Sequence, residues 1–378
     1  MCRTMDNGGG SRKSMSSLTR KYINSIKFSS DHVATLRMIG EYKGKQELFG
    51  KRSPEALKTM RSLAIIESTE SSNRLEGITA ERGRVRGIML GSATPESRPE
   101  QGIAGYRDAL ARIHESWEGL EFDTALIKRL HEIINSYMPE SGGRWKTKDN
   151  LIIQKWYDEK SGLEQDRVRF RPTSAKETPK AMERLVKQYA DAADDSHDPL
   201  VIIPLAVLDF LCVHPFRNGN GRVARLITLL LLYRAGYQVG RYISLERIFE
   251  ESKESYYNTL ETSSAGWHDD KHNPLPWLTY FWGVLIRAYR EFEGRVGTVT
   301  TRWGAKTEQI ELTIERQAGE FSISNIESAC PGISRVMIRN VMRRLRDEKK
   351  IKPVGAGKGR GARWMKQKQQ QTKPASQS

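Results

Sequence analysis

Apolar residues recur at helical spacing along most of the chain between residues 50 and 293. A Ser-Pro pair at 53–54 has the pattern of a helix N-terminus, and the apolar positions after it predict a helix to about Ser71. The same spacing predicts further helices over 102–114, 124–137, 175–193, 200–213, 222–235, 245–260 and 274–293. Two stretches rich in β-branched and aromatic residues, 150–157 and 167–171, predict a β-hairpin. We therefore expect a mainly α-helical domain with one inserted β-hairpin.

The remaining segments predict how the chain divides. The two ends are polar and lack a periodic apolar pattern, which is typical of disorder. We expect a disordered lead-in at 1–17, an N-terminal region at 18–95, a core at 96–293, a linker at 294–304, a basic domain at 305–366 and a disordered tail at 367–378.

Composition narrows the class of protein. The chain has 378 residues, of which 38% are hydrophobic and 29% charged, so it is long enough for two or three folded domains. Its cysteines, Cys2, Cys212 and Cys330, have no CxxC spacing, which favours a reducing cytoplasm over a disulfide framework or a zinc site. The longest apolar stretch, 200–213, is too short to span a bilayer, and we expect neither a secretory signal nor a membrane partner.

Positive charge is concentrated near the C-terminus. The formal net charge is +16, and residues 331–366 hold 12 Lys and Arg against two acidic residues. Such an excess predicts a polyanionic ligand or partner.

The turn between two strongly apolar helices, 214–225, has the sequence His-Pro-Phe-Arg-Asn-Gly-Asn-Gly-Arg-Val-Ala-Arg. A turn with two glycines that opens a helix is suited to bind an anion, because backbone N–H groups approach it closely and the helix dipole favours negative charge. Arg222 and Arg225 are three residues apart and can reach the same polyphosphate. His214 adds a candidate base, and Asn218 adds an oxygen that could contact a metal.

This stretch resembles the signature of the Fic family, His-Pro-Phe-x-Asp/Glu-Gly-Asn-Gly-Arg-x-x-Arg, and matches every family-defining position except one. The surrounding helices and the hairpin extend the resemblance over residues 50–293. It implies a Fic-type helical bundle with an inserted hairpin "flap", and it implies transfer of AMP from ATP to a Ser, Thr or Tyr hydroxyl of a target protein or of the chain itself.

The resemblance also implies roles for single residues. His214 would take the proton of the attacking hydroxyl. The phosphates of ATP would be held by Gly219, Asn220, Gly221, Arg222 and Arg225. The departure from the pattern is Asn218, where the family has an acid that coordinates Mg²⁺, so we expect weaker metal binding. Tyr256 and Tyr257 resemble the family's adenine contacts, although ordinary core packing explains them almost as well.

Residues 72–77, Ser-Asn-Arg-Leu-Glu-Gly, fit the inhibitory motif of Fic proteins, which begins at Ser72 here. The resemblance implies that Glu76 pairs with Arg225 and takes the place that the γ-phosphate needs. Because the motif precedes the core, the chain resembles the class with an N-terminal inhibitory helix. In some members the same glutamate positions water to remove AMP, so reversal of the modification is a further expectation.

Two other regions predict partners. The family's flap holds a target segment by strand addition, so we expect a target protein at the hairpin, 150–170; a hairpin that merely caps the bundle is the alternative. Three short helical patterns, two strands and a glycine-rich loop after residue 305 resemble a winged helix-turn-helix. Its outward arginines, together with Lys358 and Arg360 of the loop, predict duplex-DNA binding through 334–363. Protein binding or subunit pairing is the alternative there, and family members often form homodimers.

Three functions remain open at this point. The first is an autoinhibited protein adenylyltransferase, and the intact His214 and both arginines favour it. The second is a DNA-binding regulator whose Fic core senses nucleotide with little turnover, which Asn218 keeps open. The third is transfer of a different phosphate-containing group, since the turn recognises phosphates and not adenine.

Overall fold

The computed structural model describes residues 17–367, apart from residues 53, 159–162, 316, 318, 331–332 and 355–361. The expected disordered ends lie outside this range except for Ser17 and Gln367. Ser17 is fully buried, and its Oγ donates a hydrogen bond to Asp209 Oδ1 at 2.6 Å, so the ordered chain begins before residue 18. The chain divides into two compact units, 1–293 and 294–378.

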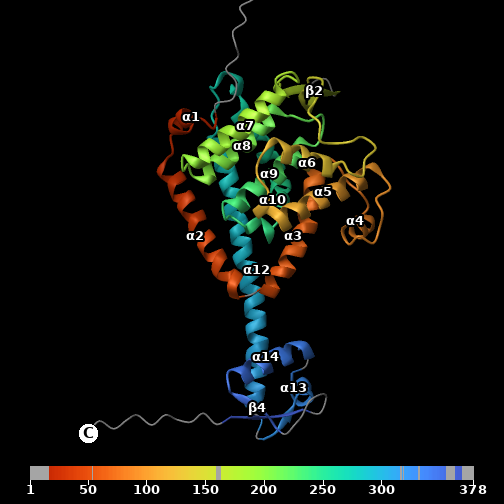
Figure 1. The fold of residues 1–378 in the computed structure, drawn as a ribbon, viewed down its shortest axis with the longest axis vertical. Helices are drawn as coiled ribbons and strands as arrows, with labels where there is room; N and C mark the ends of the chain where they lie inside the picture. Colours follow the sequence, from red (N-terminus) through yellow and green to blue (C-terminus); the bar gives the residue numbers. More distant parts are fainter. Residues whose placement is uncertain are drawn as a thin grey trace, which may run out of the picture. The chain divides into compact units, whose positions relative to one another are not determined.

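The first unit is a bundle of helices with one hairpin, as Figure 1 shows. Its α-helices are α1 (Arg20–Ser25), α2 (Ser30–Arg52), α3 (Pro54–Leu75), α4 (Arg82–Met89), α5 (Arg98–Ser116), α6 (Thr124–Ile134), α7 (Thr178–Asp194), α8 (Pro199–Val213), α9 (Asn220–Arg234), α10 (Leu245–Glu251), α11 (Lys253–Ser264) and the first part of α12 (Leu275–Glu315). Short 3₁₀ helices lie at Trp117–Gly119, Val239–Arg241 and Trp267–Asp269. The expected mainly helical fold class is confirmed.

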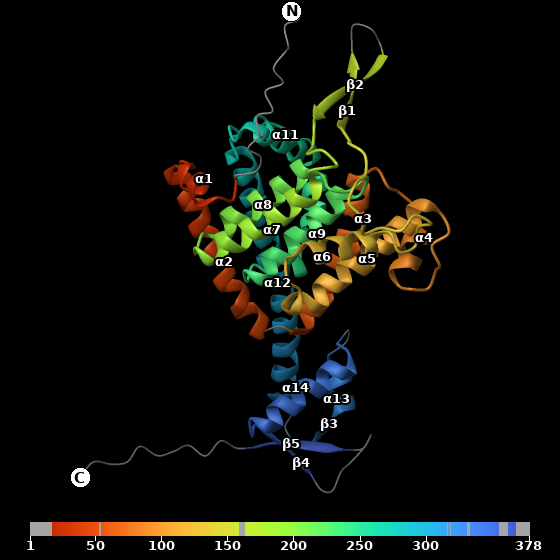
Figure 2. The same ribbon diagram turned by 45° about the horizontal axis from the view of Figure 1, so that its top comes forward.

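The hairpin is also confirmed, with β1 (Ile152–Asp158) and β2 (Leu163–Phe170) paired antiparallel. The two strands extend beyond the helices of the bundle (Figure 2). Exposed apolar side chains, Ile153 and Val168, face each other across the pair. The hairpin therefore presents an apolar surface next to the helices that carry the candidate site.

Helices α8 and α9 form the centre of the first unit, and nearly all of their side chains are buried. Pro204 lies inside α8 and cannot donate to the carbonyl of Leu200 four residues earlier. The indole N–H of Trp282 donates to that carbonyl instead at 2.8 Å. A partner from α12 therefore satisfies the backbone group that the proline leaves free, and α8 continues as a helix to Val213.

One expectation for the helices is wrong in detail. The helix expected over 245–260 is interrupted at Ser252, which ends α10 and precedes α11. The division between the two compact units falls between residues 293 and 294, where the expected linker begins. The backbone of 294–304 is helical and belongs to α12, and a glycine costs a helix only about 1 kcal/mol. The apolar pattern also resumes at Ile310 and Ile314, which are both buried.

The second unit has its own core. Besides the end of α12 it contains β3 (Phe321–Ser322), α13 (Ile323–Ala329), α14 (Arg335–Asp347), β4 (Ile351–Val354) and β5 (Arg363–Lys366), and the sheet order is β3-β5-β4. Ile338, Val341 and Leu345 of α14 are buried in this core, as the apolar spacing predicts. None of the helices that the structure describes is both long and apolar enough to cross a bilayer.

Candidate active site

His214 follows the last residue of α8 and adopts a left-handed backbone conformation, with φ 51°. Its ring Nδ1 lies 3.2 Å from the carbonyl oxygen of Leu211, which can only accept, so Nδ1 carries the proton and donates. The lone pair is then on Nε2. Burial lowers the pKa of His214 to about 4, and the positive charge of Lys146 adds to this effect. His214 is therefore a neutral imidazole whose Nε2 can accept a proton.

The turn after His214 is held by a side chain of α9. Asn220 Oδ1 accepts from the backbone N–H of Phe216 at 2.9 Å, and its Nδ2 donates to the Phe216 carbonyl at 2.8 Å. Gly219 precedes α9 with φ 77°, a conformation that other residues adopt only at a cost. The predicted glycine turn therefore does open a helix N-terminus, where backbone N–H groups are available to an anion.

Arg225 and the end of α3 form a buried contact. Arg225 Nη2 lies 2.9 Å from Glu76 Oε1, its Nε donates to Ser72 Oγ at 2.8 Å, and Nη2 also donates to the Ser72 carbonyl at 2.9 Å. The Arg225 side chain is only 2% exposed. Although burial opposes it, the charge of Glu76 raises the pKa of Arg225 above its ordinary value. The structure thus brings Glu76 onto Arg225, the pairing that the resemblance implies, and it adds contacts from Ser72 to the same arginine.

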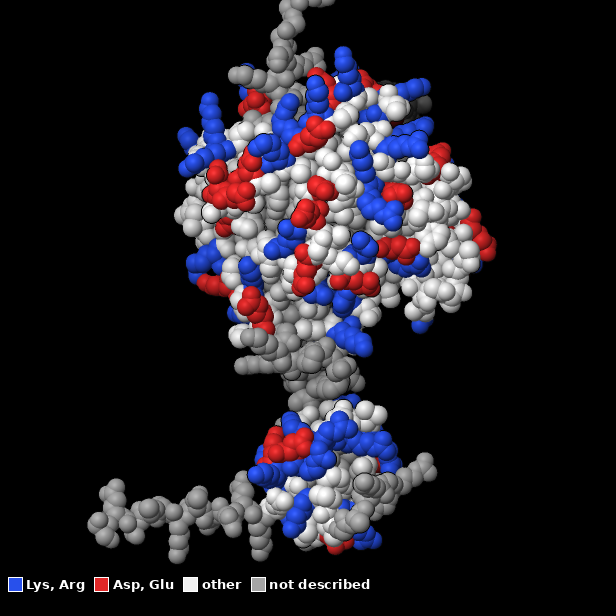
Figure 3. Space-filling view, in the orientation of Figure 1, with Lys and Arg blue, Asp and Glu red and all other residues white. Residues whose placement is uncertain are grey.

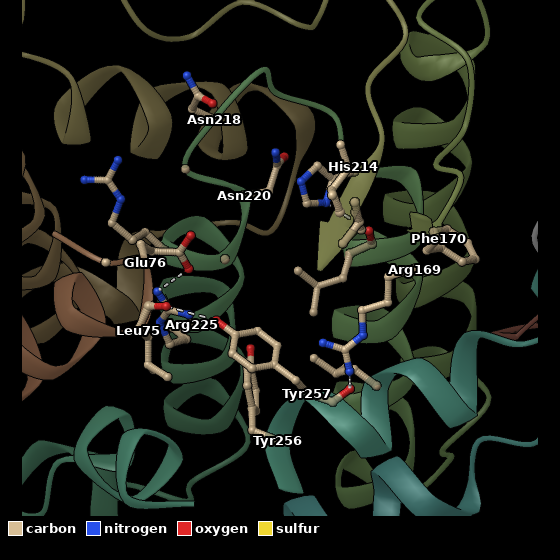
Figure 4. A pocket seen from close by; sticks show the side chains of 18 of the residues that line it. Leu75, Glu76, Arg169, Phe170, His214, Asn218, Asn220, Arg225, Tyr256 and Tyr257 are labelled. Atoms are coloured by element: carbon tan, nitrogen blue, oxygen red, sulfur yellow. Dashed lines mark hydrogen bonds and ion pairs between the residues drawn. The ribbon is translucent and has the colours of Figure 1, made fainter. Parts of the chain in front are cut away.

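Gly221 is the point where Glu76 approaches the turn. A Cβ atom on Gly221 would overlap Glu76 Oε1, so any other residue here would force the carboxylate to move. Figure 4 shows Glu76 beside Arg225 on one side of the pocket and His214 on the other. The acid therefore lies over the first turn of α9, where the turn's N–H groups and arginines would otherwise meet an anion.

Two buried arginines of α9, Arg222 and Arg225, have N–H groups without a hydrogen-bond partner among the described residues. The Arg222 side chain is buried, and its nearest acceptors, Asn73 Oδ1 and the Gly102 carbonyl, are both 3.5 Å away. Arg222 Nε and Arg225 Nη1 have no hydrogen-bond partner among the described residues. A buried guanidinium with unsatisfied N–H groups is costly unless a ligand pairs with it, so these two side chains fit an anionic ligand.

The structure distinguishes the two tyrosines of α11. Tyr256 is almost fully buried and packs against Phe249 and Trp277, as a core residue does. Tyr257 is partly exposed and donates its hydroxyl hydrogen to the carbonyl of Leu75 at 3.0 Å. Arg169 of β2 lies 5.4 Å from the Tyr257 ring centre. Both tyrosines line the pocket, and Tyr257 is the one with a ring that a purine could contact.

Glu76, His214, Arg222, Arg225 and Tyr257 line one pocket of about 1350 Å³ in the first unit. Its walls come from the end of α3, the start of α5, the hairpin, the turn at 214–221 and α11. This volume exceeds the range of about 300–1,000 Å³ that is usual for small-molecule sites, so a nucleotide and part of a second reactant can fit together.

Asn218 lies on the outer part of the turn with its side chain exposed, as Figure 4 shows. In the described ranges, no group of three or more His, Cys, Asp or Glu side chains is arranged to hold a metal ion. The amide oxygen of Asn218 is neutral, and hard cations prefer carboxylates. A contact from Asn218 would therefore be weaker than one from a carboxylate at the same position.

Sequence reasoning missed three residues that fix this turn. His131 of α6 stacks on Phe216 with ring centres 3.8 Å apart. Because its Nδ1 accepts from Gly143 N–H at 2.9 Å, its Nε2 donates to the Asn218 carbonyl at 3.1 Å. The other two, Lys146 and Asn150, contact the backbone near His214. His131 and Lys146 belong to no predicted motif, and Asn150, which begins the stretch 150–157 of the predicted hairpin, has no local pattern that marks this contact.

The comparisons with known proteins agree with this geometry. A model of the Fic/DOC family matches residues 121–232, which include the whole turn. The chain is 25% identical over 199 residues to the protein adenylyltransferase fic-1 of Caenorhabditis elegans, over 51% of this chain and 35% of that protein. It is 33% identical over 96 residues to fic-1 of Caenorhabditis briggsae, over 24% of this chain and 18% of that protein. The chain thus matches only about a third or less of the length of these relatives.

Solved structures show the same fold. A Fic family protein from Desulfovibrio desulfuricans G20 is similar over 91% of this chain and 98% of its own, with a TM-score of 0.57 and 20% identity. A Fic-1 structure from C. elegans is similar over 71% of this chain and 72% of its own, with a TM-score of 0.54 and 21% identity. These likenesses show a shared, mainly helical fold, and the match to the Fic/DOC family model covers residues 121–232 of this chain.

Proposed function

We propose that this chain is an autoinhibited protein adenylyltransferase that transfers AMP from ATP to a hydroxyl of a protein. The proposal rests on two features of one pocket. His214 is neutral, with its Nε2 free to accept a proton, and two buried arginines have N–H groups without a partner among the described residues. The relatives named protein adenylyltransferase support the choice of group transferred.

In the proposed reaction the target hydroxyl attacks the α-phosphorus of ATP while His214 Nε2 takes its proton. A new P–O bond forms to the target, the bond from the α-phosphorus to the bridging oxygen breaks, and pyrophosphate leaves. The N–H groups of Gly219, Asn220 and Gly221 hold the α- and β-phosphates, and Arg222 and Arg225 balance the charge that the leaving group carries. Mg²⁺ would enter with ATP as part of the substrate and neutralise phosphate charge, and the Asn218 amide oxygen would be the group of the turn that could contact it.

Glu76 is the proposed inhibitor. Its carboxylate lies on Arg225 and against Gly221, where the γ-phosphate would pair with the arginine. We further propose that the same carboxylate can position water for removal of AMP, and that target segments add to the hairpin at 150–170, where Ile153 and Val168 offer an apolar surface.

Intact-mass measurement of the purified chain after incubation with ATP and Mg²⁺ tests the proposal. We expect the Glu76→Gly protein to gain the mass of one adenylate, the wild type to gain much less, and Glu76→Gly combined with His214→Ala to gain none. Competition by other labelled nucleotides distinguishes AMP transfer from transfer of a different phosphate-containing group. Nucleotide binding without any mass gain in Glu76→Gly would instead support a sensor with little turnover.

A second function, binding of duplex DNA by the C-terminal unit, is favoured by one face of α14. Val336, Arg339, Asn340 and Arg343 follow each other at helical spacing, and all four are exposed. Neither Arg339 nor Arg343 forms an ion pair with another described residue, whereas Arg335 pairs with Glu327 at 2.7 Å. Lys and Arg side chains gather on this unit in Figure 3. Lys358 and Arg360, which we also expected to contact DNA, lie outside the described residues.

A further inference from the structure

Lys146 and Asn150 lie just before β1, and both contact the backbone that carries His214. We propose that these two residues are positioning residues for His214: they hold the backbone at 213–216 so that Nε2 of His214 faces the pocket. The catalytic meaning of this proposal rests on the function proposed above, in which His214 is the base.

The contacts cover consecutive carbonyl groups at the end of α8. The donors and acceptors, in chain order, are Thr173 N–H to the Cys212 carbonyl at 3.3 Å, Lys146 Nζ to the Val213 carbonyl at 3.0 Å, Asn150 Nδ2 to the His214 carbonyl at 3.5 Å, Lys146 N–H to the Pro215 carbonyl at 2.8 Å, and Asn150 Nδ2 to the Phe216 carbonyl at 3.1 Å. Lys146 Nζ also donates to Asn150 Oδ1 at 2.8 Å, which joins the two side chains.

A helix C-terminus needs such partners. The last carbonyls of a helix have no intrahelical donor, and they carry the negative end of the helix dipole. The ammonium group of Lys146, which is only 6% exposed, meets both needs at once. The contacts of Lys146 and Asn150 come from a segment more than sixty residues earlier in the chain, so they are not a consequence of local sequence.

Because His214 has a left-handed backbone conformation, the contacts of Lys146 and Asn150 affect where its imidazole points. A residue other than glycine with φ 51° is strained, and it stays so only where its surroundings hold it. Relaxation of this one residue would turn the imidazole away from the pocket. The carbonyls on both sides of His214 are fixed by Lys146 and Asn150, so these side chains are the ones that oppose the relaxation.

Lys146 also affects the charge of the base. The charged groups that act on His214 are Lys146, which disfavours protonation, and Glu76, which favours it. Asp149 acts on Lys146 in turn. Burial lowers the pKa of Lys146 to about 8, so the side chain is still mainly cationic at neutral pH. Its positive charge therefore helps to keep the imidazole neutral and able to accept a proton.

The test uses the full chain with Glu76→Gly as the parent, and compares Lys146→Met and Asn150→Ala with the matched control Lys148→Met, whose side chain is exposed. Self-adenylylation is measured as a function of ATP concentration and pH. Separately, NMR of isotope-labelled histidine follows the titration of His214, which is identified by its loss in His214→Ala. Circular dichroism checks that each variant is folded.

We expect Lys146→Met to lower kcat by about 100-fold, the scale of a positioned base, with the KM for ATP changed by no more than about twofold. Its His214 pKa should rise, so the acid limb of the rate profile moves to higher pH. Asn150→Ala should lower kcat with a smaller change in the His214 pKa, and Lys148→Met should resemble the parent.

Two results would overturn the proposal: a folded Lys146→Met protein with the parent's kcat and His214 pKa, or an equal loss in Lys148→Met. The NMR titration keeps this test separate from that of the proposed function. If the parent transfers no AMP but Lys146→Met still raises the His214 pKa, the adenylyltransferase assignment fails while the contact between Lys146 and the imidazole stands.

Discussion

The carboxylate of Glu76 packs against the backbone of Gly221, the second glycine of the turn. A Cβ atom at position 221 would occupy the space that this carboxylate fills. The same carboxylate accepts from Arg225 at 2.9 Å. An acid on the N-terminal turn of a helix, paired with an arginine, makes the contacts that a phosphate group makes in the same place. Glu76 and the end of a triphosphate therefore compete for one set of donors.

We expect Gly221→Ala to lower the unfolding free energy only when Glu76 is present. The added methyl group overlaps Glu76 Oε1, the end of a partly exposed side chain that can move aside by giving up its ion pair with Arg225, so the variant should lose about 1 kcal/mol of unfolding free energy. In the Glu76→Gly background the clash is absent, and most of that loss should disappear. ATP binding should stay weak in both, because the methyl group also obstructs the phosphate position. Denaturant unfolding and nucleotide titration of the four proteins measure these effects, and equal destabilisation in both backgrounds would contradict the idea.

Glu76→Gln should relieve the proposed inhibition only in part. The amide keeps the size of the carboxylate and one hydrogen bond to Arg225, but it loses the charge. A hydrogen bond to a charged group is stronger than a neutral one by roughly 1 kcal/mol, so we expect self-labelling to rise about five- to tenfold, less than in Glu76→Gly. Initial rates with labelled ATP measure this order, and a Gln variant as active as the Gly variant would show that shape alone excludes ATP.

Much of the fold could be predicted because its signals are local. The apolar run at 200–213 predicts a buried helix, and the glycine turn that follows predicts a helix N-terminus. The hairpin follows from its β-branched residues. In contrast, α2 was missed because its pattern is not amphipathic, with Val33 and Leu48 both exposed.

The contacts within the site were less predictable. The pair of Arg225 and Glu76 joins residues 149 positions apart, and only the family resemblance indicated it. Lys146 and His131 bind backbone carbonyl groups in and next to the turn. Every residue has a carbonyl group, so the sequence of the turn does not indicate where these side chains bind. Pairs of this kind depend on how the bundle folds and not on any spacing in the sequence.

Tyr257→Phe should separate two roles of this residue. The hydroxyl of Tyr257 holds the carbonyl of Leu75, next to Glu76, whereas its ring faces the pocket. Loss of one neutral hydrogen bond of about 1 kcal/mol should loosen the end of α3 and raise self-labelling by up to about fivefold, with the KM for ATP unchanged. Tyr280→Phe is the matched control, because its hydroxyl contacts Ser252 at 2.7 Å and not α3. Equal effects in the two variants would contradict the link to Leu75.

Folding stability of the chain should fall in mild acid. Burial lowers the pKa values of His131, His214 and His272 from 6.5 to about 4, so the unfolded chain takes up more protons between these values, and stability is lost as pH falls from 6.5 towards 4. Asp209 acts in the opposite direction, because burial raises its pKa to about 7. A net uptake of one proton changes the unfolding free energy by about 1.4 kcal/mol per pH unit.

The variant Asp209→Asn checks this assignment. Asparagine can still accept from Ser17 Oγ and Trp267 N–H, but it does not titrate. Without the opposing group, the loss of stability between pH 6.5 and 4 should become steeper. Denaturant unfolding at pH 5, 6 and 7 measures the slope, and an unchanged or shallower slope would mean that Asp209 is ionised in the folded protein.

DNA binding by α14 should depend on the arginines that have no acidic partner. For the full chain, the slope of log affinity against log salt should fall by about 0.9 for each phosphate contact removed. We expect Arg339→Ala and Arg343→Ala each to weaken duplex binding and reduce the slope, because neither arginine is paired with a described acid. Arg335→Ala is the matched control, since Glu327 already neutralises Arg335 and leaves it less able to bind phosphate. Fluorescence anisotropy at several salt concentrations measures both quantities. Binding that ignores salt, or an equal loss in Arg335→Ala, would favour a protein partner for this unit.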